Sequence, residues 1–114
     1  IVSGHVACAA PVVRIEEAEN QRDLYFSAPP QWLKFIMLKG YAALDGASLT
    51  VSALDLDAEE FGVSLIPETI ERTTLGRRRI GDRVNLEVDS QTQTIVETVE
   101  RLAESGRFSN LLPR

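Results

Sequence analysis

The stretch that decides the fold is YAALDGASLTVSAL, residues 41–54. It contains two apolar runs separated by Asp45-Gly46, a residue pair typical of the two-residue turn between antiparallel strands. We therefore predict a β-hairpin with strands over 41–44 and 47–54. Because side chains alternate between the two faces of a strand, Ser48 and Thr50 should share one face.

Four more segments are typical of short strands, since they are rich in β-branched residues or alternate apolar with polar side chains: 6–15, 24–27, 61–66 and 84–88. We interpret the charged segments between them, such as 16–23, as turns. The connections are too short for parallel crossovers. A closed six-stranded antiparallel barrel suits this length and leaves no exposed sheet edge. The sequence therefore predicts an all-β fold.

Three helices are expected at the connections. Pro30 and Pro67 suit the first turn of a helix, and Gly40 and Gly76 are typical of helix ends. The first helix should bury one face, and the last should begin at a Ser90/Gln93 capping box. The members of these two apolar faces are Leu33, Ile36 and Met37 in the first helix, and Ile95, Val96, Val99, Leu102 and Ala103 in the last.

Composition limits the possible functions. The chain has 114 residues, enough for one domain, and a formal charge of -5. An acidic domain with few aromatic residues is a poor candidate for nucleic-acid binding. We expect no membrane span, because the sequence lacks an apolar run of sufficient length. The sequence begins at Ile1 without a methionine, so we expect that it is preceded by a further segment.

The strand 47–54 carries the first candidate binding surface. The interior of a small barrel is apolar, so Ser48 and Thr50 should point outward. Two hydroxyl groups in register can hydrogen-bond a flat, polar heterocycle on the outer wall. An ordinary polar outer face is the alternative interpretation.

Ile66-Pro67-Glu68-Thr69 leads from a strand into a helix and forms a second candidate. The first backbone N–H groups of a helix lack intrahelical partners and can bind a carbonyl-rich ligand. The alternative is that Thr69 caps its own turn. Lys39 either binds a polar ligand atom or complements the dipole of the helix before Gly40.

His5 and Asp89 are the candidates for proton transfer. A histidine can exchange a proton near neutral pH, although a strand-edge histidine bonded to a backbone carbonyl is equally consistent with the sequence. Asp89 ends the last strand, where it can act as a base or as a helix cap. Helix N–H groups near Asp89 favour its ionised form, so a strongly raised pKa is not expected.

The remaining polar residues suggest no further chemistry. We interpret Arg77-Arg78-Arg79 as a solvated turn. Cys8 has no cysteine or histidine partner at metal-ligand spacing, so we predict no metal site. A single cysteine allows no internal disulfide and favours a cytoplasmic protein.

Taken together, several motifs resemble the riboflavin synthase family. The resemblance extends from Ile1 to about Leu102 and is specific in the order and spacing of its blocks. These are Ser3-Gly4-His5-Val6, Lys39-Gly40-Tyr41, Asp45 to Val51, Phe61 to Thr69, Thr73-Thr74-Leu75-Gly76, Gly81 to Asp89 and Thr98 to Arg101.

The resemblance implies a Greek-key barrel that binds 6,7-dimethyl-8-ribityllumazine. Enzymes of this family carry two such barrels and a terminal helix, and the Ser-Gly-His block opens the second barrel. The chain thus resembles the C-terminal half, with a lumazine-binding barrel over 1–89, an oligomerisation helix over 90–104 and a tail over 105–114. The whole enzyme transfers a four-carbon unit between two lumazines, giving riboflavin and a pyrimidine, without a metal or other cofactor.

The resemblance also implies a set of site residues and partners. The active site lies between the first barrel of one subunit and the second barrel of a neighbour, and the terminal helices gather three subunits. His5 and Asp89 match positions implicated in proton handling, and Ala7 departs from an aspartate found in many members. The implied substrate contacts are Gly4, His5, Val6, Lys39, Ser48, Leu49, Thr50, Leu65, Ile66, Pro67, Glu68, Thr69 and Ile70.

Two other functions remain open at this stage. Relatives of the family serve as non-catalytic lumazine or flavin carriers, and the same hydroxyl face suits both roles. A generic oligonucleotide-binding barrel is the third interpretation, which the negative charge and low aromatic content disfavour.

Overall fold

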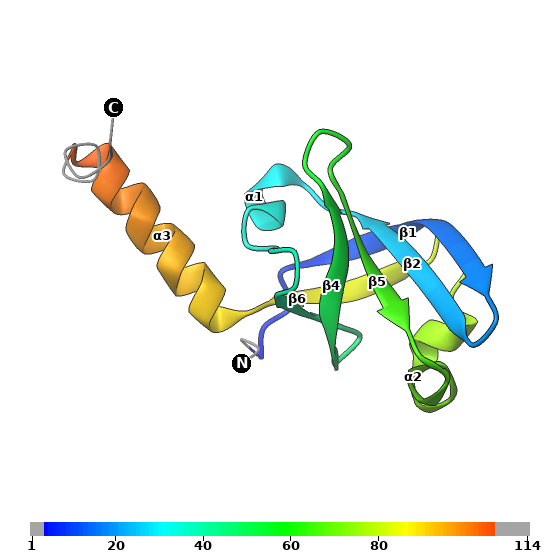
Figure 1. Ribbon diagram of the computed structural model, residues 1–114. Coiled ribbons are helices and arrows are strands. Elements are labelled where there is room, and N and C mark those ends of the chain that lie inside the picture. Colours follow the sequence, from blue (N-terminus) through cyan, green and yellow to red (C-terminus); the bar gives the residue numbers. More distant parts are fainter. Residues whose placement is uncertain (1–3, 107–114) are drawn as a thin grey trace.

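Six antiparallel strands close into a barrel in the order β1-β2-β5-β4-β3-β6 (Figure 1). The computed structural model describes residues 4–106, so Ser3 and most of the predicted tail over 105–114 lie outside the described residues. The strands are β1 (Cys8–Ala18), β2 (Gln21–Ser27), β3 (Tyr41–Leu44), β4 (Ala47–Asp55), β5 (Glu60–Leu65) and β6 (Arg83–Val88). The predicted barrel is confirmed.

Short helices occupy the connections. They are α1 (Pro30–Leu33), α2 (Pro67–Arg72) and the 3-10 helix η1 (Thr74–Arg77), and the chain continues after β6 into α3 (Ser90–Glu104). No helix within residues 4–106 combines the length and hydrophobicity needed to cross a lipid bilayer.

Every second residue of a strand points into the barrel, and these inward-pointing residues are apolar. Leu24, Phe26, Val63 and Leu86 are fully buried, and the rings of Phe26 and Phe61 stack with centroids 5.3 Å apart. This core fixes which side chains face outward along each strand.

The hairpin of β1 and β2 is longer than predicted. We expected a charged turn over 16–23, but Glu16–Ala18 and Gln21–Asp23 continue the two strands and only residues 19 and 20 form the turn. Asn20 has a φ of 61°, a conformation that asparagine tolerates well. Charged side chains in this part of the hairpin pair with one another, as in the 3.2 Å contact between Arg22 Nε and Glu17 Oε1.

The two proline-initiated helices are shorter than predicted. The first helix ends at Leu33, so the helical spacing does not extend to Met37. Leu33 and Ile36 are buried, whereas Met37 is 43% exposed. The second helix ends at Arg72 rather than Gly76, which lies in η1. Within this helix, Glu68 and Arg72 form an ion pair at 3.1 Å.

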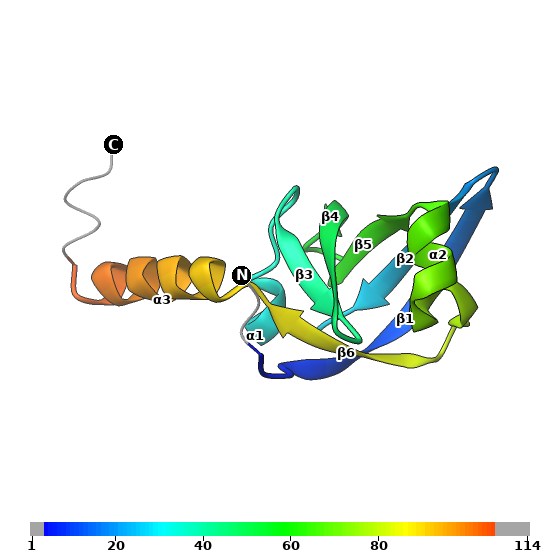
Figure 2. The ribbon, with the colours of Figure 1, turned by 90° about the horizontal axis from the view of Figure 1, so that it is seen from below.

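The capping box predicted for the last helix is wrong. The N-cap is Asp89, whose carboxylate accepts hydrogen bonds from the hydroxyl of Thr92 at 2.8 Å and from its backbone N–H at 3.4 Å. Figures 1 and 2 show that α3 extends away from the barrel. Lys34, directly after α1, forms an ion pair with Glu100 of α3 at 3.0 Å.

Candidate functional site

The hydroxyl-bearing face of β4 points outward, as predicted. Ser48 and Thr50 are exposed and Val51 is buried, while Leu49 is half-buried and packs against the core. The pairing of β3 with β4 places Tyr41 directly opposite Thr50, and Tyr41 is 57% exposed. Directly opposite residues share one face of a sheet, so the tyrosine ring and the two hydroxyls belong to one outer surface.

The first half of β4 pairs with β3 along one of its two edges. The Val51 N–H donates to the Gly40 carbonyl at 2.8 Å and its carbonyl accepts from the Lys39 N–H at 2.9 Å. Backbone groups of alternate residues face opposite edges of a strand, so those of Ser48 and Thr50 face β5. Within residues 4–106, the register between β4 and β5 begins only at Val51. The edge beside Ser48 and Thr50 therefore lies outside that ladder.

Leu65 to Ile70 forms the neighbouring wall, but its residues differ in exposure. The side chain of Leu65 is fully buried in the barrel, so only its backbone can meet a ligand on the outer surface. Ile66 is 59% exposed, and Pro67 and Glu68 are exposed too. Ile66 holds the N-cap position of α2, so the alternative interpretation of Thr69 as the cap is wrong.

Lys39 lies beside the hydroxyl face and away from any helix end. It is exposed, has a φ of 70°, and its backbone bonds to Val51. The alternative, that Lys39 complements a helix dipole, is wrong because α1 ends at Leu33, and the dipole effect fades within one turn.

His5 and Asp89 lie at the same end of the barrel. The Ala7 N–H donates to the Leu86 carbonyl at 2.7 Å and the Gly4 N–H to the Glu87 carboxylate at 3.1 Å. Residues 4–7 thus run beside the end of β6, and the antiparallel register of Cys8 with Leu86 continues toward His5 and Asp89. Gly4, His5 and Val6 are exposed there.

The pKa of Asp89 lies below its ordinary value. Burial by itself raises the pKa, but the hydrogen bonds from the Thr92 hydroxyl and backbone N–H stabilise the charged form and lower it. The helix-cap interpretation of Asp89 is therefore confirmed, and its carboxylate is ionised at neutral pH.

Tyr41 is a site candidate that the sequence analysis missed. The β3–β6 register pairs Ala42 with Val88, so Tyr41 comes level with Asp89, and on its other side it faces Thr50. Tyr41 thus lies between Asp89, one of the proton-transfer candidates, and the hydroxyl face of β4. Strand alternation could have identified it, because Ala42 and Leu44 point inward and Tyr41 has the opposite parity.

Arg78 is not part of a solvated turn, as we had predicted for Arg77-Arg78-Arg79. Its guanidinium group forms an ion pair with Asp45 in the β3–β4 turn, and its side chain is 31% exposed. Arg77 and Arg79 are exposed.

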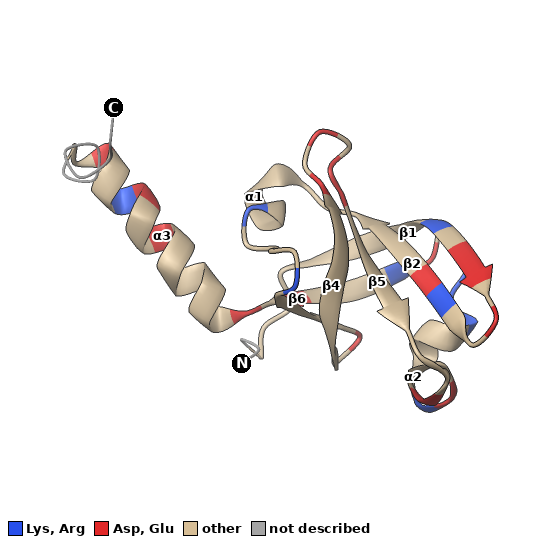
Figure 3. Ribbon diagram, in the orientation of Figure 1, with Lys and Arg blue, Asp and Glu red and all other residues tan. Residues whose placement is uncertain are grey.

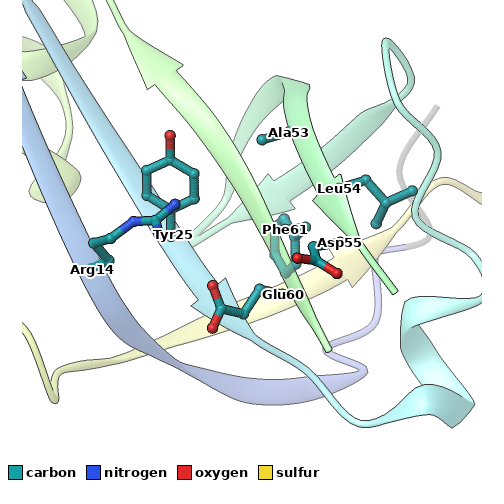
Figure 4. A pocket seen from close by; sticks show the side chains of 7 residues that line it. All are labelled: Arg14, Tyr25, Ala53, Leu54, Asp55, Glu60 and Phe61. Carbon is teal, nitrogen blue, oxygen red and sulfur yellow. The ribbon is translucent and has the colours of Figure 1, made fainter. Parts of the chain in front are cut away.

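Two hollows on the barrel surface lie apart from the hydroxyl face. One, of about 120 Å³, contains an arginine over a tyrosine ring, 3.9 Å from the ring centroid (Figure 4). Its lining residues Asp55 and Glu60 lie on either side of the β4–β5 turn, which carries acidic residues (Figure 3). The other, of about 320 Å³, includes Pro67 and Ile70 but opens toward the β1–β2 hairpin. The first is lined by Arg14, Tyr25, Ala53, Leu54, Asp55, Glu60 and Phe61.

Curated relatives are enzymes of about twice this length. Riboflavin synthase of Escherichia coli (strain K12) is 47% identical over 103 residues, which cover 90% of this chain and 47% of that protein. Riboflavin synthase of Chlamydia pneumoniae is 44% identical over 108 residues, covering 94% and 51%. The chain thus spans about half the length of the curated relatives it matches.

Solved structures share the barrel. LumP complexed with riboflavin superposes with a TM-score of 0.71 at 22% identity, covering 80% of this chain and 48% of LumP. LumP complexed with 6,7-dimethyl-8-(1'-D-ribityl) lumazine gives a TM-score of 0.67 at 23% identity, covering 77% and 47%. At this identity the likeness shows the fold.

A match to a domain family gives more direct evidence of membership than the shared barrel does. The model of the lumazine binding domain matches residues 3–89, which include the whole barrel and stop at the cap of α3. The chain therefore belongs to the lumazine binding domain family.

Proposed function

We propose that the chain is the C-terminal half of a riboflavin synthase, a transferase, and that it binds 6,7-dimethyl-8-ribityllumazine and riboflavin on the outer face of β4. The observation that carries the proposal is the edge at Ser48 and Thr50. There two exposed hydroxyls lie beside backbone groups that face away from β3. The dione edge of a lumazine alternates N–H and C=O groups, and a strand edge alternates the same groups.

The surrounding residues suit the rest of such a ligand. Tyr41 offers a ring face level with Thr50, and Lys39 offers a cation at the end of the strand. The exposed Ile66-Pro67-Glu68 stretch, followed by Thr69 and Ile70, forms the wall on the β5 side. The buried Leu65 and half-buried Leu49 support this surface from below.

The complete active site is proposed to need a second barrel. The curated relatives are about twice as long as this chain, which supports an N-terminal barrel of the same family as the partner. Two lumazines would then stack between the two barrels, and a four-carbon unit would move from one to the other. Fixing two reactants in one orientation can supply much of the rate acceleration. The strand order of the barrel supports the Greek-key connection that the family implies.

His5 and Asp89 are the proposed catalytic residues. The reaction begins when a proton leaves an acidic methyl group on one lumazine. The ionised carboxylate of Asp89 can accept a proton or orient a hydroxide ion, and the exposed His5 lies at the same end of β6. Exposed Gly4 and Val6 flank this histidine, so a ligand can approach the backbone there.

The terminal helix is proposed to assemble the enzyme into a trimer. Ile95 is 63% exposed and Val99 39% exposed on one stripe of α3, which extends away from the barrel (Figure 2). An amphipathic helix in that position buries its apolar stripe when it packs against copies of itself. A soluble biosynthetic enzyme of this kind is proposed to be cytoplasmic.

The proposal is tested by a fluorescence titration of this chain with 6,7-dimethyl-8-ribityllumazine and with riboflavin. Riboflavin formation is then measured with and without the N-terminal barrel of the Escherichia coli enzyme. We expect saturable binding of one ligand per chain, and turnover only when the second barrel is present.

Absence of binding to either ligand contradicts the proposal. Tight binding without turnover in the presence of the added barrel would favour the alternative, a non-catalytic lumazine or flavin carrier. Assaying the Escherichia coli barrel alone controls for activity that does not depend on this chain.

A further inference from the structure

A polar cluster ties the β3–β4 turn to the segment that follows α2. Asp45 accepts hydrogen bonds through one carboxylate oxygen from the backbone N–H of Asn85 at 2.9 Å. The other oxygen accepts from the hydroxyl of Thr74 at 3.3 Å and from the guanidinium group of Arg78. The side chain of Asp45 is 15% exposed, so this carboxylate has exchanged most of its water for protein partners.

A second arginine attaches the same segment to the opposite side of the barrel. Arg22 of β2 donates from its guanidinium group to the Leu75 carbonyl at 2.9 Å and to the Arg78 carbonyl. Its side chain is 11% exposed. Leu75 itself is fully buried, which anchors η1 in the core. The η1 segment is therefore held from two sides, by β2 and by the β3–β4 turn.

The position of η1 fixes the position of α2. Gly76 lies so close to Ile70 that an added Cβ would collide with the Ile70 carbonyl oxygen and the Ile70 side chain. The Thr73 hydroxyl also donates to the Thr69 carbonyl at 2.7 Å. Since α2 begins at Pro67, the contacts of η1 locate the wall that follows β5.

These contacts connect the β3–β4 turn, which leads into the Ser48 end of β4, with the region of α2. Within residues 4–106, the β4–β5 register starts at Val51, so the Ser48 end of β4 is not held to β5 in that way. Asp45 precedes Ser48 by three residues, and Figures 1 and 2 show the β3–β4 turn and α2 on the same side of the barrel. The polar cluster supplies the missing connection.

We propose that Asp45 and Arg78 are positioning residues that set the separation between the Ser48 end of β4 and α2, and thereby the preference of the hydroxyl face between the two-ring lumazine and the three-ring riboflavin. This inference rests on the proposed function, because it presumes that these ligands bind at the hydroxyl face. Neither residue touches the ligand. They act through Ser48 on one wall and through Ile66 and Pro67 on the other.

The test compares Arg78→Ala and Arg78→Lys with Arg77→Ala as matched control. All three keep the barrel residues, and Arg77→Ala removes the same charge from an exposed neighbour. Dissociation constants for ribityllumazine and riboflavin are measured by fluorescence titration, and folding is checked by thermal unfolding. The informative quantity is the ratio of the two constants, since general destabilisation lowers both affinities together.

For Arg78→Ala we expect this ratio to shift by about threefold or more from that of the unmodified chain, because a changed separation between β4 and α2 affects the fit of the three-ring ligand differently from that of the two-ring ligand. Arg78→Lys should recover part of the shift, since an ammonium group can still pair with Asp45. Arg77→Ala should leave the ratio unchanged.

An unchanged ratio in Arg78→Ala, with the ligands bound by the unmodified chain, would overturn this inference and leave the proposed function intact. If Arg78→Ala does not fold, Asp45→Asn, which removes the charge from the other member of the pair, decides in the same way. Failure of the unmodified chain to bind either ligand would instead contradict the proposed function itself.

Discussion

Asp45 is the residue at which charge and fold are most closely linked. Burial alone raises its pKa, but the hydrogen bonds and charge of Arg78, with those from Asn85 and Thr74, lower it below the ordinary value. A carboxylate whose pKa is lower in the folded chain stabilises the fold above its unfolded pKa, near 4. That stabilisation is lost as the pH falls through the folded pKa.

We therefore expect Asp45→Asn to lower the free energy of unfolding at pH 7 by about 1–3 kcal/mol, the usual value of hydrogen bonds to a charged group. The difference from the unmodified chain should shrink below about pH 4. Urea unfolding at a series of pH values measures it, with Asp57→Asn, an exposed acidic residue, as the control. A pH-independent difference would contradict this assignment.

The two roles of Asp89, as helix cap and as proposed base, can be tested separately with one substitution. Asparagine caps helices about as well as aspartate, so Asp89→Asn should leave the stability of α3 nearly unchanged. In the enzyme completed by the second barrel, kcat should fall by about 100-fold or more, with the lumazine dissociation constant within about threefold. Steady-state kinetics and titration check both values. Unchanged turnover would remove Asp89 from the mechanism.

At the residue scale, alternation along a strand was sufficient to predict the outward hydroxyls of Ser48 and Thr50. The same alternation could have predicted that the side chain of Leu65 points into the barrel. The pairing of Asp45 with Arg78 could not be predicted, because the two residues are 33 positions apart and meet only once the barrel is closed.

At the scale of elements, α3 carries an apolar stripe that the barrel leaves largely uncovered. Val96 packs against the core near the start of the helix, whereas Ile95 and Val99 remain exposed. The Lys34–Glu100 ion pair is a contact of the later turns with the barrel. Such an exposed pair contributes little free energy, and it leaves Ile95 and Val99 uncovered.

We expect the unmodified chain to sediment as a trimer at micromolar concentration, and Val99→Asp to sediment as a monomer. Burying a carboxylate in an apolar helix interface is unfavourable by several kcal/mol, whereas the same charge on the other face is solvated. Thr94→Asp, which places the charge at an exposed position off the stripe, is the control. Sedimentation velocity distinguishes the species, and a monomeric unmodified chain would contradict the proposed assembly.

The positions of β3 to β6 were predicted well because alternation and turn residues mark them, as at Asp45-Gly46, whereas the charged ends of β1 and β2 resembled a turn. Helix ends were predicted less well. Met37 had a helical spacing that continued past the true end of α1, and Gly76 proved to be required for close packing on Ile70 rather than as a helix end. Tertiary packing determined the structure at both positions, and a local sequence pattern carries no information about tertiary packing.

At the scale of the whole molecule, the proposed function makes the barrel one wall of a binding site. The core fixes the outward face of β4, the turn and η1 hold that face relative to α2, and β6 brings Asp89 to one end. The surface is open to solvent at Ser48 and Thr50, which suits a ligand held between two barrels. The second barrel supplies the other wall in this account.

The central claim is that the β4 hydroxyls bind the lumazine ring. It is tested most directly by titrating the double variant Ser48→Ala/Thr50→Val with 6,7-dimethyl-8-ribityllumazine. Ser52→Ala serves as the control, because the Ser52 hydroxyl already donates to the Gly62 carbonyl at 3.3 Å. Two lost hydrogen bonds predict an affinity about 5–100-fold weaker, with the control within about twofold. A double variant that binds as tightly as the unmodified chain would contradict the account.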